Sequence, residues 1–198
     1  NGSPYESNKL SERQQIIKSR CEESNLPIIY LNLVGGQDDL VFDGGSFVYD
    51  NRGNIVCQFP QFLEKTQQVF FEQRKSSWVP LSGSLAEIGS RESQDYKAVV
   101  LGLRDYVLKS NFHKVVIGLS GGIDSALVAV MAVDALGADN VLCLALPSKF
   151  NSKASLEDAK QLSQNLGITL ETITIQEIID KVDQHLAPLF QGKKRDVT

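Results

Sequence analysis

Ser120-Gly121-Gly122-Ile123-Asp124-Ser125 is the stretch that decides the fold of this chain. An apolar run at 115–119 precedes it, and a stretch of small and apolar residues at 126–133 follows it. This order predicts a strand, a tight glycine turn and a helix. Such a turn leaves backbone N–H groups unpaired at the positive end of the helix dipole, so a phosphate or pyrophosphate group is the expected ligand.

The residue types within the turn fit this chemistry. The two glycines permit a close approach of the backbone to a ligand, and Ser120 and Ser125 add hydroxyl donors. Asp124 would repel a bare phosphate, so we expect its carboxylate to hold a Mg²⁺ ion that bridges to the phosphates. The alternative is an ordinary strand–helix turn in which Ser and Asp only cap the helix. The flanking strand and helix favour the phosphate-binding interpretation.

Strands and helices alternate on both sides of this turn. We expect strands at 114–119, 141–146 and 168–175, with helices at 124–136, at 156–166 and up to about 186. We also expect Ser93 to cap a preceding helix that ends near 110, and Ser155 to open the helix at 156 through a capping box. The alternation predicts an α/β fold with a parallel sheet covered by helices on both faces.

The first part of the chain has a different pattern, rich in β-strands with one helix. We expect a helix at 8–24, a buried strand at 27–34, a turn at 35–39, a hairpin around a turn at 50–53 and a further strand at 67–73. A stretch rich in Ser, Pro and Gly then suggests a linker. The predicted domains are therefore 1–75 and 93–198, joined by a linker at 76–92.

Composition narrows the function classes. The chain has 198 residues, 42% of them hydrophobic and 22% charged, with a net charge of −4. This balance indicates a soluble globular protein, argues against a nucleic-acid partner and offers no stretch long enough to cross a membrane. Three widely spaced cysteines argue against a disulfide frame and favour the reducing cytoplasm. The basic run Lys193-Lys194-Arg195 could neutralise phosphates or simply be solvated.

Two motifs carry a family resemblance. The turn at 120–125 resembles the pyrophosphate loop of N-type ATP pyrophosphatases. The run Gly35-Gly36-Gln37-Asp38-Asp39-Leu40-Val41-Phe42-Asp43-Gly44-Gly45-Ser46, together with Asn1 to Tyr5 and Pro147-Ser148, resembles the glutamine-dependent NAD synthetases. The resemblance implies the C-terminal part of a nitrilase-like (CN hydrolase) α-β-β-α glutaminase domain, followed by part of a Rossmann-like domain of the adenine nucleotide alpha-hydrolase type.

The resemblance also implies a reaction. Members of this family are ligases of NAD biosynthesis: ATP adenylates the nicotinate carboxylate of deamido-NAD, and ammonia from glutamine then displaces AMP to give NAD. The implied cofactors are ATP and Mg²⁺, and the implied partners are deamido-NAD, glutamine or ammonia, and further copies of the protein in a homo-oligomer. Two alternatives stay open: another amidotransferase with the same loop, acting on a different carboxylate, or a nucleotide-binding module without turnover.

The resemblance assigns roles to particular residues. The family's ATP-binding positions fall on Gly118, Leu119, Ser120, Gly121, Gly122, Ile123, Asp124 and Ser125. Asp124 matches the magnesium carboxylate, and Ser3 and Lys9 match two glutamine contacts, for which the alternative is a loop serine and a solvated lysine. The family's Glu–Lys–Cys triad lies upstream of Asn1, so we expect an internal fragment without a catalytic residue of its own, in which Cys21 is not the nucleophile.

Other candidate ligands are better explained without a ligand. Asp38, Asp39 and Asp43 do not have the spacing of a calcium loop, so we expect turn carboxylates that accept from backbone N–H groups. His113 and His185 have no partner residues at ligand spacing and are expected at the surface or at helix ends. Cys57 and Cys143 are expected to be small core residues.

Overall fold

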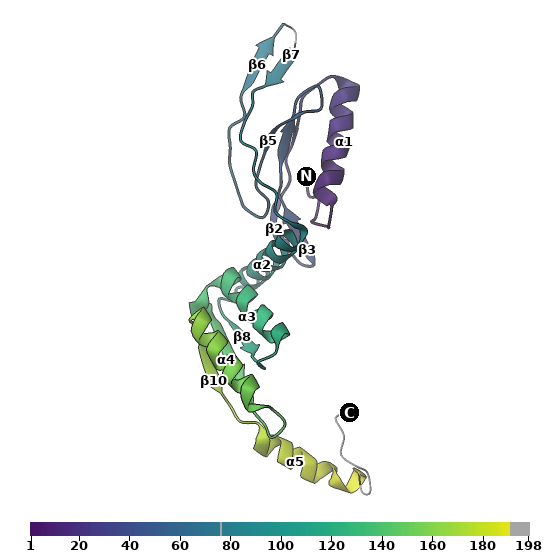
Figure 1. Cartoon of the computed structure of the whole chain (residues 1–198). Coiled ribbons are helices and arrows are strands. Elements are labelled where there is room, and N and C mark those ends of the chain that lie inside the picture. Colours follow the sequence, from purple (N-terminus) through teal and green to yellow (C-terminus); the bar gives the residue numbers. More distant parts are fainter. Residues whose placement is uncertain (76, 191–198) are drawn as a thin grey trace. The chain divides into compact units, whose positions relative to one another are not determined.

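The computed structural model describes residues 1–75 and 77–190, and these form two compact units, one of residues 1–112 and one that starts at 113 (Figure 1). The basic run at 193–195 lies outside the described residues. The domain limits predicted from the sequence, at 75 and 93, remain predictions. The two compact units are defined by contacts within the chain, and such units need not coincide with evolutionary domains.

The first unit begins with a helix that packs on a small antiparallel sheet. Its elements are α1 (Lys9–Ser24), β1 (Ile28–Tyr30), β2 (Val34–Gln37), β3 (Leu40–Asp43), β4 (Phe47–Tyr49), β5 (Ile55–Gln58), β6 (Phe71–Arg74), β7 (Ser77–Pro80) and α2 (Arg91–Lys109). Strands β1, β4 and β5 pair in the order β1-β4-β5, and the predicted hairpin with its turn at 50–53 is confirmed as β4–β5.

Aromatic and apolar side chains from α1 and β4 make the core of this unit. Leu10 and Cys21 of α1 are buried together with Phe47 and Tyr49 of β4. The ring of Tyr30 stacks on that of Phe47, with centroids 4.9 Å apart. Burial of this apolar surface holds α1 on the sheet.

The turn predicted at 35–39 is wrong. Residues 34–37 form strand β2, which pairs antiparallel with β3, and only Asp38 and Asp39 form the turn. The two glycines were expected to bend the chain, but they serve a close approach instead: a Cβ on Gly36 would lie 3.1 Å from the Cα of Gly102 in α2.

Helix α2 is fastened to β2 by polar contacts as well. The backbone N–H of Gly36 donates to Oδ2 of Asp105 at 2.7 Å, and Nζ of Lys109 donates to the carbonyl oxygen of Gly36. The helix begins at Arg91, and its cap is Ser90, whose Oγ accepts from the N–H of Ser93 at 3.3 Å. The prediction that Ser93 is the cap is therefore wrong by three residues.

The segment between the predicted domains is more ordered than the expected linker. It contains β7, which pairs with β6, and a stretch that lies alongside β5 and forms backbone hydrogen bonds with it. There the N–H of Gly83 donates to the carbonyl of Val56, and the N–H of Ala86 donates to that of Gln58, at 2.7 and 3.0 Å. The weak apolar periodicity of this segment therefore did not indicate a backbone without hydrogen-bond partners.

The second unit contains the predicted parallel sheet. Its elements are β8 (Val115–Gly118), α3 (Ile123–Leu136), η1 (Ala138–Asn140), β9 (Val141–Ala145), α4 (Lys153–Leu166), β10 (Thr169–Thr172), α5 (Gln176–Leu186) and η2 (Ala187–Phe190). The strands run parallel in the order β10-β9-β8. Within the described residues, no helix is long and apolar enough to cross a membrane.

Two helices of the second unit, α3 and α4, lie on one face of this sheet. Helices α3 and α4 contact each other and both pack on β9, as successive right-handed crossovers that step in one direction require. Cys143 and Ala145 of β9 are buried, whereas Val116, on the opposite face, is 62% exposed. The parallel α/β architecture is confirmed, whereas the covering of the second face stays a prediction.

The helix ends of this unit are partly as predicted. Helices α3 and α4 stop at Gly137 and Gly167, both with positive φ. Helix α4 begins three residues earlier than expected, because Ser152, and not Ser155, is the cap: its Oγ accepts from the N–H of Ser155 at 3.0 Å.

Candidate nucleotide-binding site

The predicted phosphate loop lies between the carboxyl end of β8 and the amino end of α3. Gly118 is the last residue of β8, and the N–H of buried Leu119 continues the parallel ladder by donating to the carbonyl of Leu144 at 2.8 Å. Gly122, in an extended conformation, is the N-cap of α3. The carboxyl edge of a parallel sheet next to a helix start is the usual place for a nucleotide in such folds.

The two loop hydroxyls are engaged with the loop itself. The N–H of Ser120 donates to Oγ of Ser125, and the N–H of Gly122 donates to Oγ of Ser120, each at 3.2 Å. The two hydroxyl oxygens are 3.0 Å apart, and Oγ of Ser125 also donates to the carbonyl of Gly122 at 2.9 Å. We expected both serines to be available to a ligand, but in this structure they close the turn.

The remaining amides of the loop are available. The N–H groups of Gly121, Ile123, Asp124 and Ser125 have no acceptor among residues 1–75 and 77–190. Three of them belong to the first turn of α3, where helix geometry leaves N–H groups unpaired and the dipole is positive. The ability of the loop to bind a phosphate therefore depends more on the N–H groups of the helix terminus than on the two serine hydroxyls.

Gly121 brings the start of α4 against the loop. Its φ is +82°, and a Cβ at this position would overlap the backbone of Ser155. Glycine is thus needed both for the dihedral angle and for the contact. Sequence reasoning placed Ser155 at a helix start but gave no signal that it would lie beside the loop.

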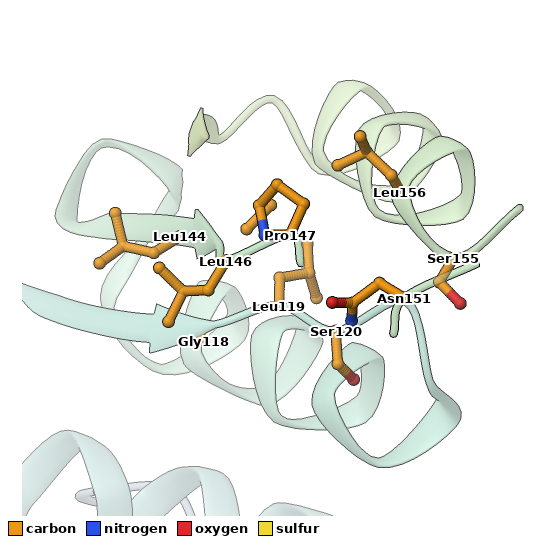
Figure 2. A pocket seen from close by; sticks show the side chains of 10 residues that line it. Gly118, Leu119, Ser120, Leu144, Leu146, Pro147, Asn151, Ser155 and Leu156 are labelled. Carbon is orange, nitrogen blue, oxygen red and sulfur yellow. The ribbon is translucent and has the colours of Figure 1, made fainter. Parts of the chain in front are cut away.

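A hollow of about 200 Å³ opens next to the loop (Figure 2). It is lined by the carboxyl ends of β8 and β9, the segment after β9 and the start of α4: Gly118, Leu119, Ser120, Leu144, Ala145, Leu146, Pro147, Asn151, Ser155 and Leu156. In Figure 2 the polar side chains of Ser120, Asn151 and Ser155 gather toward one side, and Leu144 and Leu146 lie toward the other. An apolar cleft with a few polar groups suits a flat heterocycle.

A side-chain contact shapes the segment after β9. Oδ1 of Asn151 accepts from both the N–H and the hydroxyl of Ser148, at 2.8 and 2.9 Å. The next residue, Lys149, donates its N–H to Gln176 of α5 at 2.7 Å, and its Nζ lies 3.3 Å from Asp180. These contacts hold the segment beside the hollow, which Pro147 and Asn151 help to line.

Asp124 lies exposed in the first turn of α3. Within the described residues no three His, Cys, Asp or Glu side chains are grouped so that they could hold a metal ion. The exposed carboxylate of Asp124, next to the unpaired amides, could hold a cation whose other ligands are phosphate oxygens and water.

The two predicted glutamine contacts have separate partners in the first unit. Ser3 is half-buried, and its Oγ accepts from Nε of Arg13 at 3.0 Å. Nζ of Lys9 lies 3.6 Å from Glu6 and 3.5 Å from Glu12. Lys9 would have to exchange these carboxylates for that of a ligand.

The structure reveals a buried ion pair that sequence reasoning missed. Nη1 of Arg13 donates to Oδ1 of Asp43 at 2.8 Å, and the two side chains are only 5% and 1% exposed. The expectation that Asp43 is a turn carboxylate paired with backbone N–H groups is wrong. Arg13 stands in a polar stretch of α1, so its sequence context gave no signal of burial.

The cysteines behave as expected for core residues. Cys21, Cys57 and Cys143 are all buried free thiols. Burial raises the pKa of each thiol, which keeps it protonated and unreactive. Cys21 is fully buried on α1, which agrees with the expectation that it is not a nucleophile.

Sequence comparisons find known proteins that are similar over the whole of this chain. The sequence profile of the family described as NAD synthase matches residues 95–196. A glutamine-dependent NAD(+) synthetase from Rhodobacter capsulatus is 48% identical over 198 residues, which are all of this chain and 36% of the relative. A protein of the same name from Synechocystis sp. is 43% identical over 96% of this chain and 34% of its own length.

A solved structure supports the same similarity. The glutamine-dependent NAD+ synthetase from Acinetobacter baumannii, in complex with adenosine diphosphate, superimposes with a TM-score of 0.92 at 38% identity, over 99% of this chain and 37% of that one. The chain thus spans little more than a third of the length of the relatives it matches.

Proposed function

Because the chain belongs to the NAD synthase family, we propose that the protein containing it is a ligase that converts deamido-NAD into NAD. ATP adenylates the nicotinate carboxylate and releases pyrophosphate, and ammonia then displaces AMP. A carboxylate is a poor acyl donor, and adenylation supplies the leaving group that the amidation needs.

The observation that carries this proposal is the row of unpaired amides at the start of α3, beside the hollow at the edge of the sheet. We infer that the phosphates of ATP accept from the N–H groups of residues 121 and 123–125 and that the adenine occupies the hollow. The hydroxyls of Ser120 and Ser125, now paired with one another, would turn toward the phosphates. Donors fixed in advance around a departing pyrophosphate stabilise the charge that develops on it.

We propose that Asp124 holds Mg²⁺ at this site. Its exposed carboxylate, next to the unpaired amides, fits an ion that shares its ligands with phosphate oxygens. A bound Mg²⁺ would supply Lewis-acid stabilisation of the pyrophosphate. Residues of this chain bind and orient the nucleotide.

For the first unit we propose a role in the use of glutamine. Ser3 and Lys9 are proposed to contact the substrate, with the cation of Lys9 at its α-carboxylate. This assignment rests on the family resemblance and on the half-buried position of Ser3. We further propose a homo-oligomer in the cytoplasm, where three free cysteines remain reduced.

The decisive experiment is ATP–pyrophosphate exchange in the full-length protein, with deamido-NAD as the acid. We expect exchange that needs both Mg²⁺ and deamido-NAD. Exchange that occurs only with another carboxylic acid would replace the proposal by a different amidotransferase. Tight ATP binding without any exchange would instead indicate a nucleotide-binding module without turnover.

A further inference from the structure

Arg13 holds the segment that carries Ser3 by its whole guanidinium group. Its Nε donates to Oγ of Ser3 at 3.0 Å, and its Nη2 donates to the carbonyl oxygens of Ser3 and Pro4 at 3.0 and 2.7 Å. Its Nη1 is paired with Asp43, which also accepts from Gln61 at 2.9 Å. The planar fork therefore contacts two adjacent residues and one buried carboxylate together.

Asn32 fixes the backbone of the same serine. Its Oδ1 accepts from the N–H of Ser3, and its Nδ2 donates to the carbonyl of Ser3, both at 2.9 Å. Asn32 is itself buried and receives further support where its N–H donates to Oγ of Ser46 at 3.0 Å. Every polar group of Ser3 is thus engaged except the hydrogen of its hydroxyl.

The bond from Arg13 decides what the Ser3 hydroxyl can do. A guanidinium N–H can only donate, so Oγ must accept in this bond, and its own hydrogen has to point elsewhere. Within the part of the chain that the structure describes, that hydrogen has no acceptor. The hydroxyl is consequently oriented as a donor for an oxygen atom that comes from outside this network.

We propose that Arg13 is a positioning residue for glutamine recognition, which orients the Ser3 hydroxyl as a hydrogen-bond donor to an oxygen of the substrate. The inference rests on the proposed glutamine role of Ser3. In this role Arg13 does not touch the substrate. The carboxylate of Asp43 compensates the buried positive charge of Arg13.

The test is a double-mutant cycle in the full-length protein, with NAD formation measured once with glutamine and once with ammonia. Arg13→Lys keeps a cation for Asp43 but loses the fork. We expect it to raise KM for glutamine about tenfold with kcat nearly unchanged, because the hydrogen bond from the Ser3 hydroxyl to the substrate is lost from binding. Ammonia-dependent NAD formation should not change, because it bypasses the glutamine site.

The cycle separates positioning from mere structural support. If Arg13 acts through the hydroxyl, Arg13→Lys adds less than about twofold to KM in a Ser3→Ala background, because the group it orients is gone. Arg20→Lys is the matched control, since Arg20 is on the same helix, is 65% exposed and is paired with Glu23. It should leave KM for glutamine unchanged.

Each other outcome overturns the inference in a recognisable way. Independent, multiplying effects of the two substitutions, or a normal KM in Arg13→Lys, would refute positioning while the glutamine role of Ser3 stands. A normal KM in Ser3→Ala would remove that role and the inference with it. If Arg13→Lys fails to fold, the double variant Arg13→Gln/Asp43→Asn takes its place, because it leaves no unpaired buried charge. It is measured with and without Ser3→Ala, and we expect the same changes in KM.

Discussion

Replacing Gly121 by alanine tests whether the phosphate loop depends on contact with α4. The residue has φ +82°, and the added methyl group would overlap the backbone of Ser155. A left-handed conformation costs an alanine about 1 kcal/mol, and displacing the start of α4 adds about 1–3 kcal/mol. We therefore expect the free energy of unfolding to fall by about 2–4 kcal/mol, and ATP binding to weaken because the loop amides move.

Two matched substitutions divide this cost into its parts. Gly167, the cap of α4, has φ +66°, and a Cβ added there would meet no atom within 4 Å, so Gly167→Ala measures the conformational cost alone, about 1 kcal/mol. Gly118 has neither a positive φ nor a neighbour within 4 Å, and Gly118→Ala should stay within about 0.5 kcal/mol of the original protein. Urea unfolding followed by circular dichroism gives all three values. A loss in Gly121→Ala no larger than in Gly167→Ala would refute the argument from contact with α4.

Three further substitutions probe separate parts of the chain. Asp124→Asn should abolish Mg²⁺-dependent ATP cleavage with an unchanged circular dichroism spectrum, and retained cleavage would show that Asp124 is only a helix-terminal acid. Burial, and then the hydrogen bond to Asp95, raises the pKa of Tyr5 from 10.0 to about 12. The unfolded chain therefore gives up this proton first, so stability should fall as the pH rises from 10 towards 12, and Tyr5→Phe should flatten that fall in urea titrations at stepped pH. Asp105→Ala removes the acceptor for the N–H of Gly36 and should lower the free energy of unfolding by about 1–2 kcal/mol; an unchanged urea midpoint would show that this bond adds nothing to stability.

The second unit was largely predictable because its signals are local. Apolar runs give the strands, and the glycines after two helices stop them where the structure does, at Gly137 and Gly167. Both failures at helix starts have one cause. Ser90 and Ser93, like Ser152 and Ser155, are spaced by three, so either serine of a pair satisfies the rule for an N-cap, and in both pairs the earlier one accepts from the N–H of the later.

The remaining errors come from contacts between distant parts of the sequence. Gly36 stands in a stretch whose residue types are typical of a turn. Its role, however, depends on Gly102 and Asp105, which are more than sixty residues further along the chain. Arg13 is buried because Asp43 and the carbonyls near Ser3 surround it, and none of these lies on its own helix. No local pattern contains this information.

Helix α2 also limits how the two halves of such a protein can be separated. The family similarity starts at residue 95, inside this helix, yet the surface that α2 buries is the one facing strand β2. A polypeptide started at residue 95 would leave Gly36 behind, so the bare backbone at Gly102 would face water and Asp105 would lose its amide partner. A shorter polypeptide that begins at this point would need new side chains on that face of the helix before it could behave as an independent protein.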